Sequence, residues 1–237
     1  MSVVLGFDTA TEVLTVAVSA GAELLREVEE GPDPGGRPPH SALLMPEVER
    51  SVELAGGWER IERIAVGLGP GSYTGLRIGI ATARALSQAR GISLIGVGTL
   101  AALAAGIRER AAGDPRPALP VLDARRGQAF VALYERRGVE AWPALVLAPE
   151  SLAARVRRLD EQPVAAGSGS LRFAAELESA GAAVAPPGDP VHRVAARHIC
   201  ALGDRAEASP ASQIEPIYLR PPDADKWLER DTADRDD

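Results

Sequence analysis

The chain has 237 residues, 46% of them hydrophobic, which is enough to bury the core of one two-lobed unit or of two small domains. Its net charge of −7 disfavours tRNA binding by the chain on its own, because phosphate contacts dominate such affinity. The single cysteine, Cys200, excludes an internal disulfide, and without a signal segment or a run of roughly 20 apolar residues we expect a cytoplasmic protein that contacts no membrane.

The pattern of apolar residues predicts an α/β protein. Apolar or alternating segments predict strands over residues 3–8, 13–19, 22–28, 61–68 and 92–97. Stretches of helical period predict helices over residues 41–55, 75–89 and 99–111, with a kink or a late start forced on the first by Pro46. The proline-rich stretch 31–39 predicts a loop.

A glycine-rich loop joins the predicted strand 61–68 to the predicted helix 75–89. This signature loop consists of Gly69, Pro70, Gly71, Ser72, Tyr73, Thr74 and Gly75. Glycine and proline set tight turns here, Ser72 and Thr74 can cap the helix, and the free N–H groups at the helix start could face an anion or a partner's backbone. The loop lacks the Gly-Lys-Ser/Thr of a P-loop, and Tyr73 stands where a nucleophile elbow needs serine. An ordinary capped strand-to-helix turn explains it equally well.

The second half of the chain repeats the first. A strand ending in Asp8, a short turn and a second strand match residues 119–134, in which Asp123 takes the place of Asp8. A later strand, 164–166, leads through Gly167-Ser168-Gly169 into a predicted helix over 170–179. This duplicated unit is similar to that of the actin, Hsp70 and sugar-kinase (ASKHA) fold. We therefore predict two lobes with duplicated mixed sheets, at residues 1–112 and 113–220, followed by an acidic tail at 221–237.

Residues 69–79 resemble, almost letter for letter, the GPGSFTGLRIG signature of the TsaB (YeaZ) family. Further segments that resemble this family are 5–11, 40–46, 123–127 and 216–220, whereas residues 141–204 carry no motif. The resemblance implies a non-catalytic scaffold and dimerisation subunit of the complex that forms N6-threonylcarbamoyladenosine on tRNA next to the anticodon. It implies pairing with the catalytic subunit TsaD and the ATPase TsaE, homodimers of the isolated chain, and contact with tRNA only through the complex.

The two aspartate-bearing turns raise the question of nucleotide binding. In ATP-using members of the fold, such turns hold phosphates and a metal through backbone N–H groups. Asp8, Thr9 and Thr11 leave the first turn small enough for this, but Arg125 and its neighbour Arg126 fill the second beside Asp123. An arginine can itself bind phosphate. We expect the aspartates to act as turn caps in vestigial nucleotide loops, with no catalytic residue and no cofactor.

No metal site is expected either, because His40, His192 and His198 form no metal-binding motif and TsaD-like proteins carry a histidine pair that this chain lacks. The alternative is an enzyme of the same fold, either an ATP-dependent small-molecule kinase or a metallopeptidase.

The resemblance places a partner surface on the predicted helices 41–55 and 75–89. The second of these is rich in small residues, so that another helix can approach it closely around Ala83. The expected apolar contacts and the charged rim are Leu44, Val48, Ile80, Arg77 and Arg84. Equally compatible with the sequence is a small-residue face that packs against the protein's own core.

Overall fold

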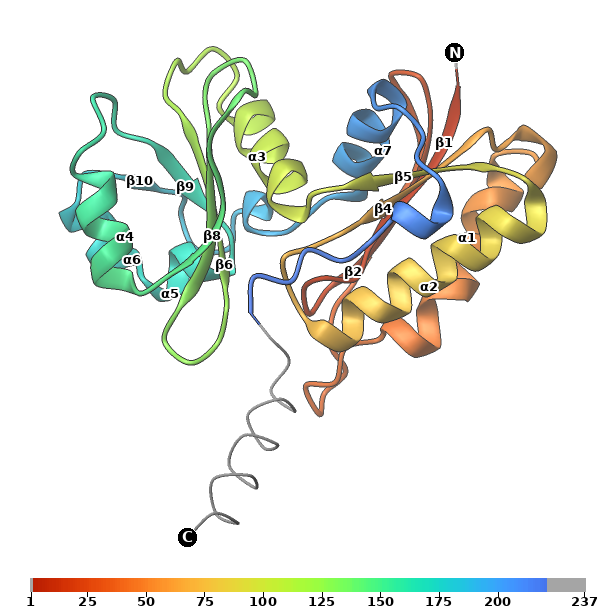
Figure 1. Cartoon of the computed structure of the whole chain (residues 1–237), viewed down its shortest axis with the longest axis horizontal. Coiled ribbons are helices and arrows are strands. Elements are labelled where there is room, and N and C mark those ends of the chain that lie inside the picture. The colour runs from red at the N-terminus through yellow and green to blue at the C-terminus, as the bar shows by residue number, and fades with distance from the viewer. Residues whose placement is uncertain (1, 221–237) are drawn as a thin grey trace, which may run out of the picture.

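The computed structural model of the chain describes residues 2–220 (Figure 1). Residue 1 and residues 221–237, with the expected acidic tail, lie outside the described residues. Within the described part, two five-stranded sheets form two lobes that lie side by side. The first sheet contains β1 (Val3–Asp8), β2 (Leu14–Ala20), β3 (Glu23–Glu30), β4 (Arg63–Gly67) and β5 (Ser93–Val97). The second contains β6 (Ala118–Asp123), β7 (Ala129–Tyr134), β8 (Glu140–Leu147), β9 (Val164–Ala166) and β10 (Ala183–Val184).

The two sheets have the same topology. In the first, the order is β3-β2-β1-β4-β5, and in the second the corresponding order is β8-β7-β6-β9-β10. In each sheet the first three strands along the chain are antiparallel neighbours, and the remaining two join in parallel. This arrangement confirms the predicted α/β fold of two lobes with duplicated mixed sheets.

The helices cover the sheets on both sides. They are α1 (His40–Leu54), α2 (Tyr73–Arg90), α3 (Thr99–Arg110), α4 (Pro149–Val156), α5 (Ser168–Arg172), α6 (Ala174–Ser179) and α7 (Ala196–Arg205), with short 3₁₀ turns at Trp58–Arg60, Pro190–His192 and Ala211–Gln213. Helices α1 and α2 pack on one face of the first sheet, where the odd-numbered residues of β1, such as Leu5 and Phe7, meet Leu44 and Val48. The even-numbered residue Val4 faces α7 on the other side. The alternation follows from the period of two in a strand.

The lobes exchange helices, which corrects the expected boundary at residue 112. Helix α3 lies before that boundary but packs on the second sheet, and α7 lies after it but packs on β1, β2 and β4 of the first sheet (Figure 1). Small residues permit the close approach of α7: a Cβ at Gly6 of β1 would lie 2.6 Å from Cys200 Sγ, and one at Gly203 would lie 2.5 Å from Ala65 Cβ. Cys200 is therefore a packing residue in the interior.

Most of the expected elements are present, with shifted ends. Pro46 lies inside α1, so the late start is wrong; a proline costs one backbone hydrogen bond, which the buried face of this helix outweighs. The predicted helix 170–179 is divided into α5 and α6 at the buried Phe173, whose φ of −112° is not helical. The chain between 141 and 204, which carried no motif, forms β8, α4, β10 and α7 as well.

Candidate functional site

The first aspartate-bearing turn, residues 8–11, is the Asp8 turn. Asp8 ends β1 and is buried. Its Oδ1 accepts the backbone N–H of Ala10 at 2.6 Å, and its Oδ2 accepts the hydroxyl of Thr99 at 2.6 Å. Burial raises the pKa of the carboxyl above its usual value, although these two hydrogen bonds and the nearby His40 oppose the shift. Asp8 caps its own turn, as the sequence predicts.

Thr99 connects the Asp8 turn to the signature loop. Besides donating to Asp8, its hydroxyl accepts the N–H of Gly69 at 3.0 Å, and its own N–H donates to the Gly69 carbonyl at 2.8 Å. The end of β1, the start of α3 and the start of the signature loop are thereby fixed to one another. A buried threonine hydroxyl can donate one hydrogen bond and accept another at the same time, and the hydroxyl of Thr99 does both.

The signature loop wraps around the Asp8 turn. The N–H of Ser72 donates to the Ala10 carbonyl at 2.7 Å, and the Thr9 hydroxyl donates to the Gly75 carbonyl at 2.8 Å. A Cβ at Gly71 would lie 2.2 Å from the Ala10 oxygen, and one at Gly75 would lie 2.0 Å from the Thr9 oxygen. These glycines are present because two backbones meet here. The helix cap predicted at Ser72 is confirmed: its Oγ accepts the N–H of Gly75 at 3.3 Å.

His40 closes the far side of the same turn. Its Nε2 lies 2.9 Å from the Thr11 carbonyl, which can only accept, so Nε2 carries a proton and donates. Burial lowers the pKa of the ring, against smaller opposing effects of the Thr11 hydrogen bond and of Asp8. Nδ1 is buried and, among the described residues, has no hydrogen-bond partner. His40 is therefore a structural residue whose burial favours the neutral ring.

The second turn holds Asp123 in a different way. Asp123 is half-buried, its Oδ1 accepts the N–H of Arg125 at 2.9 Å, and its Oδ2 accepts from the guanidinium of Arg172 at 2.7 Å. Arg125 and Arg126 have φ angles of 61° and 53°, in the left-handed region that residues with a Cβ rarely adopt. This conformation could not be predicted from the residue types, because glycine is the residue that usually occupies such positions and arginine stands here instead.

Arg125 spans the space between the lobes. Its guanidinium forms an ion pair with Glu12, at the tip of the first hairpin, so the two turns predicted as nucleotide loops do lie opposite one another. Arg220 reaches the same place from the end of the described chain and donates to the Ala124 carbonyl at 2.6 Å. Two arginines of the protein, Arg125 and Arg220, therefore lie at the second turn, where a nucleotide phosphate would have to bind.

The segment before Arg220 lies on the signature loop, a contact that sequence reasoning missed. The rings of Tyr73 and Tyr218 lie 5.1 Å apart, and the Arg77 guanidinium lies 4.1 Å above the Tyr73 ring. The N–H of Ile217 donates to the Leu68 carbonyl at 2.8 Å. The two segments that resemble the TsaB family, 69–79 and 216–220, are thus in contact with each other in the structure.

The expected partner surface requires a correction. Leu44, Val48, Ile80 and Ala83 are buried in the core between α1, α2 and the first sheet, so these four side chains face away from any partner. The physical reason is that α2 uses Gly79 and Ala83 to approach the sheet closely; a Cβ at Gly79 would lie 2.3 Å from the Thr9 hydroxyl.

The two arginines of the expected charged rim are not buried in this core. Arg77 is exposed, and the half-buried Arg84 donates to the Ile214 carbonyl at 2.7 Å. Only Arg77 therefore remains in a position to meet a partner directly.

Between residues 2 and 220, no group of three or more His, Cys, Asp or Glu side chains is arranged to hold a metal ion. Within the same range, no helix combines the length and the apolar character required to cross a lipid bilayer.

Known proteins resemble the chain both in sequence and in structure. A family model for TsaD, described as tRNA N6-adenosine threonylcarbamoyltransferase, matches residues 35–173. The tRNA threonylcarbamoyladenosine biosynthesis protein TsaB of Escherichia coli is 33% identical over 171 residues, 70% of this chain and 71% of that protein. An uncharacterised protein of Mycobacterium tuberculosis is 30% identical over 225 residues, 94% of either chain.

Solved structures agree with the sequence comparisons. YeaZ from Pseudomonas aeruginosa superimposes with a TM-score of 0.74 and 25% identity, and the match covers 92% of this chain and 100% of that one. A ROK hexokinase from Thermus thermophilus gives a TM-score of 0.52 at 16% identity, covering 85% of this chain and 98% of the hexokinase. At that identity the likeness shows the fold alone, which is the two-lobed fold that sugar kinases also have.

Proposed function

The chain belongs to the TsaB (YeaZ) family of tRNA threonylcarbamoyladenosine biosynthesis, and we propose that it is a cytoplasmic, non-catalytic subunit of the complex that forms N6-threonylcarbamoyladenosine on tRNA next to the anticodon. In this role it pairs with a TsaD-like catalytic subunit and works with a TsaE-like ATPase. It meets tRNA as part of that complex.

One observation carries the proposal: both aspartate-bearing turns are engaged by the protein itself. The Asp8 carboxylate is buried and accepts hydrogen bonds from Ala10 and Thr99, and the signature loop covers its turn. Asp123 is held by Arg172, and Arg125 beside it forms an ion pair with Glu12. A kinase of this fold would instead need carboxylates and backbone N–H groups that face its nucleotide. The geometry therefore supports a scaffold better than it supports an ATP-dependent kinase or a metallopeptidase.

For the partner surface we keep α1 and α2 but turn to the residues that these helices expose. Ala81 and Ala85, one helical turn apart on α2, are exposed together with Arg77, and Met45 of α1 is 37% exposed. Small residues on an outward helix face allow a second helix to approach, with Met45 as an adaptable apolar contact and Arg77 at the rim. We assign the pairing with a TsaD-like subunit, or with a second copy of this chain, to this face.

The test is reconstitution with the TsaD-like and TsaE-like proteins from the same genome. We expect no modified adenosine in tRNA when this chain is assayed by itself, and modification when all three proteins are present. Activity of the isolated chain would refute the non-catalytic role, and full activity of the other two proteins without this chain would refute the scaffold.

The surface is tested separately by Ala81→Arg, with Ala175→Arg on the exposed side of α6 as the matched control. We expect Ala81→Arg to stay folded and to lose the complex in size-exclusion chromatography, while Ala175→Arg keeps it. A complex that survives Ala81→Arg places the interface elsewhere.

A further inference from the structure

Arg108 of α3 carries a buried guanidinium nitrogen without a partner. Its Nη1 is shielded from solvent and, within residues 2–220, makes no hydrogen bond. Burial lowers the pKa of this guanidinium relative to an ordinary arginine, because the charge is partly removed from water. Buried guanidinium groups are normally paired, so the protein itself leaves part of the hydrogen-bonding capacity of Arg108 unused, as it does at Nε of Arg84 and Arg220.

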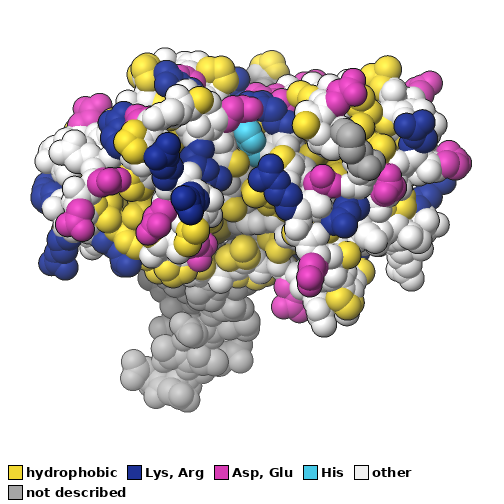
Figure 2. Space-filling model, turned by 90° about the horizontal axis from the view of Figure 1, so that it is seen from above, with side chains coloured by type: hydrophobic (Ala, Val, Ile, Leu, Met, Phe, Trp, Pro, Cys, Tyr) yellow, Lys and Arg dark blue, Asp and Glu magenta, His cyan; other side chains and the backbone are white. Residues whose placement is uncertain are grey.

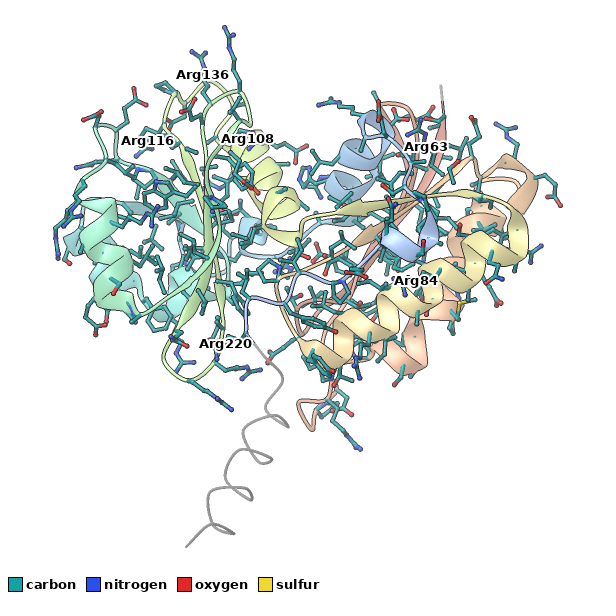
Figure 3. The ribbon with its side chains drawn as sticks, viewed as in Figure 1. Arg63, Arg84, Arg108, Arg116, Arg136 and Arg220 are labelled. Atoms are coloured by element: carbon teal, nitrogen blue, oxygen red, sulfur yellow. The ribbon has the colours of Figure 1, made fainter. Side chains whose placement is uncertain are left out.

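A cavity of about 130 Å³ lies beside Arg108. Its charged lining residues are Arg108, Arg116, Arg136 and Asp114. In Figure 3 the three labelled arginines lie together at one end of the second lobe and come from α3, from the loop after it and from the β7–β8 turn. Figure 2 looks down on that end and shows Lys and Arg side chains gathered left of centre.

The cavity has an excess of positive charge. Asp114 is bound by Arg116, with contacts of 3.0 Å from Nε and 2.7 Å from Nη2, and these hydrogen bonds lower the Asp114 pKa to about 2. The charges of Asp114 and Arg116 cancel each other. The net positive charge of the lining therefore comes from Arg108 and Arg136.

The other groups nearby do not neutralise Arg108. Tyr134, whose pKa burial raises, is a neutral phenol that donates to Glu140 at 3.3 Å. The backbone of Gly138 closes over the guanidinium, since a Cβ there would lie 3.2 Å from Arg108 Nη2. The Gly138 backbone thus encloses Arg108 on one side, and the arginines of the lining give the cavity its positive charge.

We propose that Arg108 and Arg136, with the Asp114-bound Arg116 beside them, form a binding site for a phosphate group. Guanidinium groups bind phosphate oxygens through paired, charge-assisted hydrogen bonds, and arginines from three segments can surround a tetrahedral anion. The cavity has the volume of about four waters in the liquid, which suits a group with four oxygens. The site lies on a different lobe from the exposed face of α1 and α2 and apart from Arg220 at the two turns (Figure 3). It does not depend on the proposed function.

The phosphate could belong to the backbone of tRNA or to a small phosphorylated molecule, and the experiment separates the two. The full chain is titrated with inorganic pyrophosphate at constant ionic strength while its melting temperature is followed, because a ligand that binds only the folded state raises that temperature in a saturable way. Binding of labelled tRNA is measured in parallel by fluorescence anisotropy at several salt concentrations. The variants are Arg108→Gln and Arg136→Gln, with Arg158→Gln, an exposed arginine of the same lobe, as the control.

We expect pyrophosphate to stabilise the wild type and Arg158→Gln, and to bind at least about tenfold more weakly to Arg136→Gln and Arg108→Gln, the effect of losing one charged hydrogen bond. If tRNA binding shows the same dependence on these variants and competes with pyrophosphate, the ligand is the RNA backbone; if only pyrophosphate responds, it is a small phosphate compound. Because Arg136 is exposed, its variant gives an answer even if Arg108→Gln does not fold. No saturable stabilisation, or equal binding by Arg136→Gln and Arg158→Gln, would overturn the proposal.

Discussion

The hydroxyl of Thr99 donates to the carboxylate of Asp8 at 2.6 Å across 91 residues of sequence. It joins the last residue of β1 to the first residue of α3, and through Gly69 it also holds the signature loop. A buried network of this kind stabilises only while every member is satisfied, because each unpaired polar atom in the interior costs free energy.

Asp8→Ala should destabilise the first lobe. The Ala10 N–H would lose its buried acceptor, which costs about 1–3 kcal/mol. Asp8→Asn keeps one acceptor oxygen and should cost clearly less. Guanidinium chloride unfolding of both variants measures the difference, and equal stabilities would show that the carboxylate is not the cap described here.

Gly75→Ala should destabilise the protein because its Cβ would lie 2.0 Å from the Thr9 oxygen. Forcing two backbones apart is expected to cost about 1–3 kcal/mol. Gly31→Ala is the matched control, since a Cβ at Gly31 would meet nothing within 4 Å. Unfolding midpoints of the two variants should differ, with Gly31→Ala close to the wild type; a stable Gly75→Ala would mean that the signature loop does not pack on the Asp8 turn.

His40 should make stability fall as the pH drops below about 6.5, the ordinary histidine pKa. Its pKa is lowered in the folded state, so below that pH the unfolded chain binds a proton that the folded protein does not, and unfolding is favoured. Protonation would also place a hydrogen on the buried Nδ1, which lacks a partner among the described residues.

The comparison that isolates this effect is His40→Gln, which still offers a donor to the Thr11 carbonyl. The variant should lose part of the stability decrease between neutral and mildly acidic pH. Some of the decrease remains, because burial also lowers the pKa of His198. Identical pH profiles for wild type and variant would contradict the assignment of a neutral, buried His40.

Removing the arginines of the second turn should not create a nucleotide site. The isolated chain is expected to bind ATP with Mg²⁺ no more tightly than about 1 mM, or −4.1 kcal/mol. The double variant Arg125→Gly with Arg126→Gly removes two residues with a Cβ from left-handed backbone conformations and removes both side chains from the second turn. The first turn stays covered by the signature loop. Calorimetry on the wild type and the double variant tests this, and low-micromolar binding by either protein would be incompatible with vestigial loops.

The sequence predicted the fold well because the chain is a duplication in which both copies keep a local pattern. A strand that ends in Asp8 or Asp123 before a hairpin is readable from periodicity alone, and the two lobes with duplicated mixed sheets followed from the fold that this unit resembles, whereas the order of the strands was not predicted. Helix α7 was missed although Ala196, Ile199, Cys200 and Gly203 recur at helical spacing. The stripe is short and three of its four side chains are small, so it is a weak signal in the sequence.

The candidate surface was harder to predict for a related reason. A row of small residues such as Gly79 and Ala83 indicates close approach by another backbone, and the pattern is the same whether that backbone belongs to a partner or to the protein's own β1 turn. The face of α2 that is buried is the one that contacts the Asp8 turn. This turn lies far from α2 in sequence, so the contact is not visible in the sequence. Ala81 lies about 200° around the helix from Ala83. It is outside the row of Leu76, Gly79 and Ile80, so the two alanines are told apart once the buried face of α2 is known.

The exchange of α3 and α7 between the lobes also governs how the chain can fold during synthesis. When residue 112 leaves the ribosome, α3 has no second sheet to cover, and the face of β1 that carries Val4 and Gly6 still awaits α7. The first lobe is therefore complete only after Arg205 has emerged, which makes the two halves one cooperative unit. A gene cut at the apparent boundary would yield two fragments that each expose an apolar sheet face, and only their co-expression would be expected to give soluble protein.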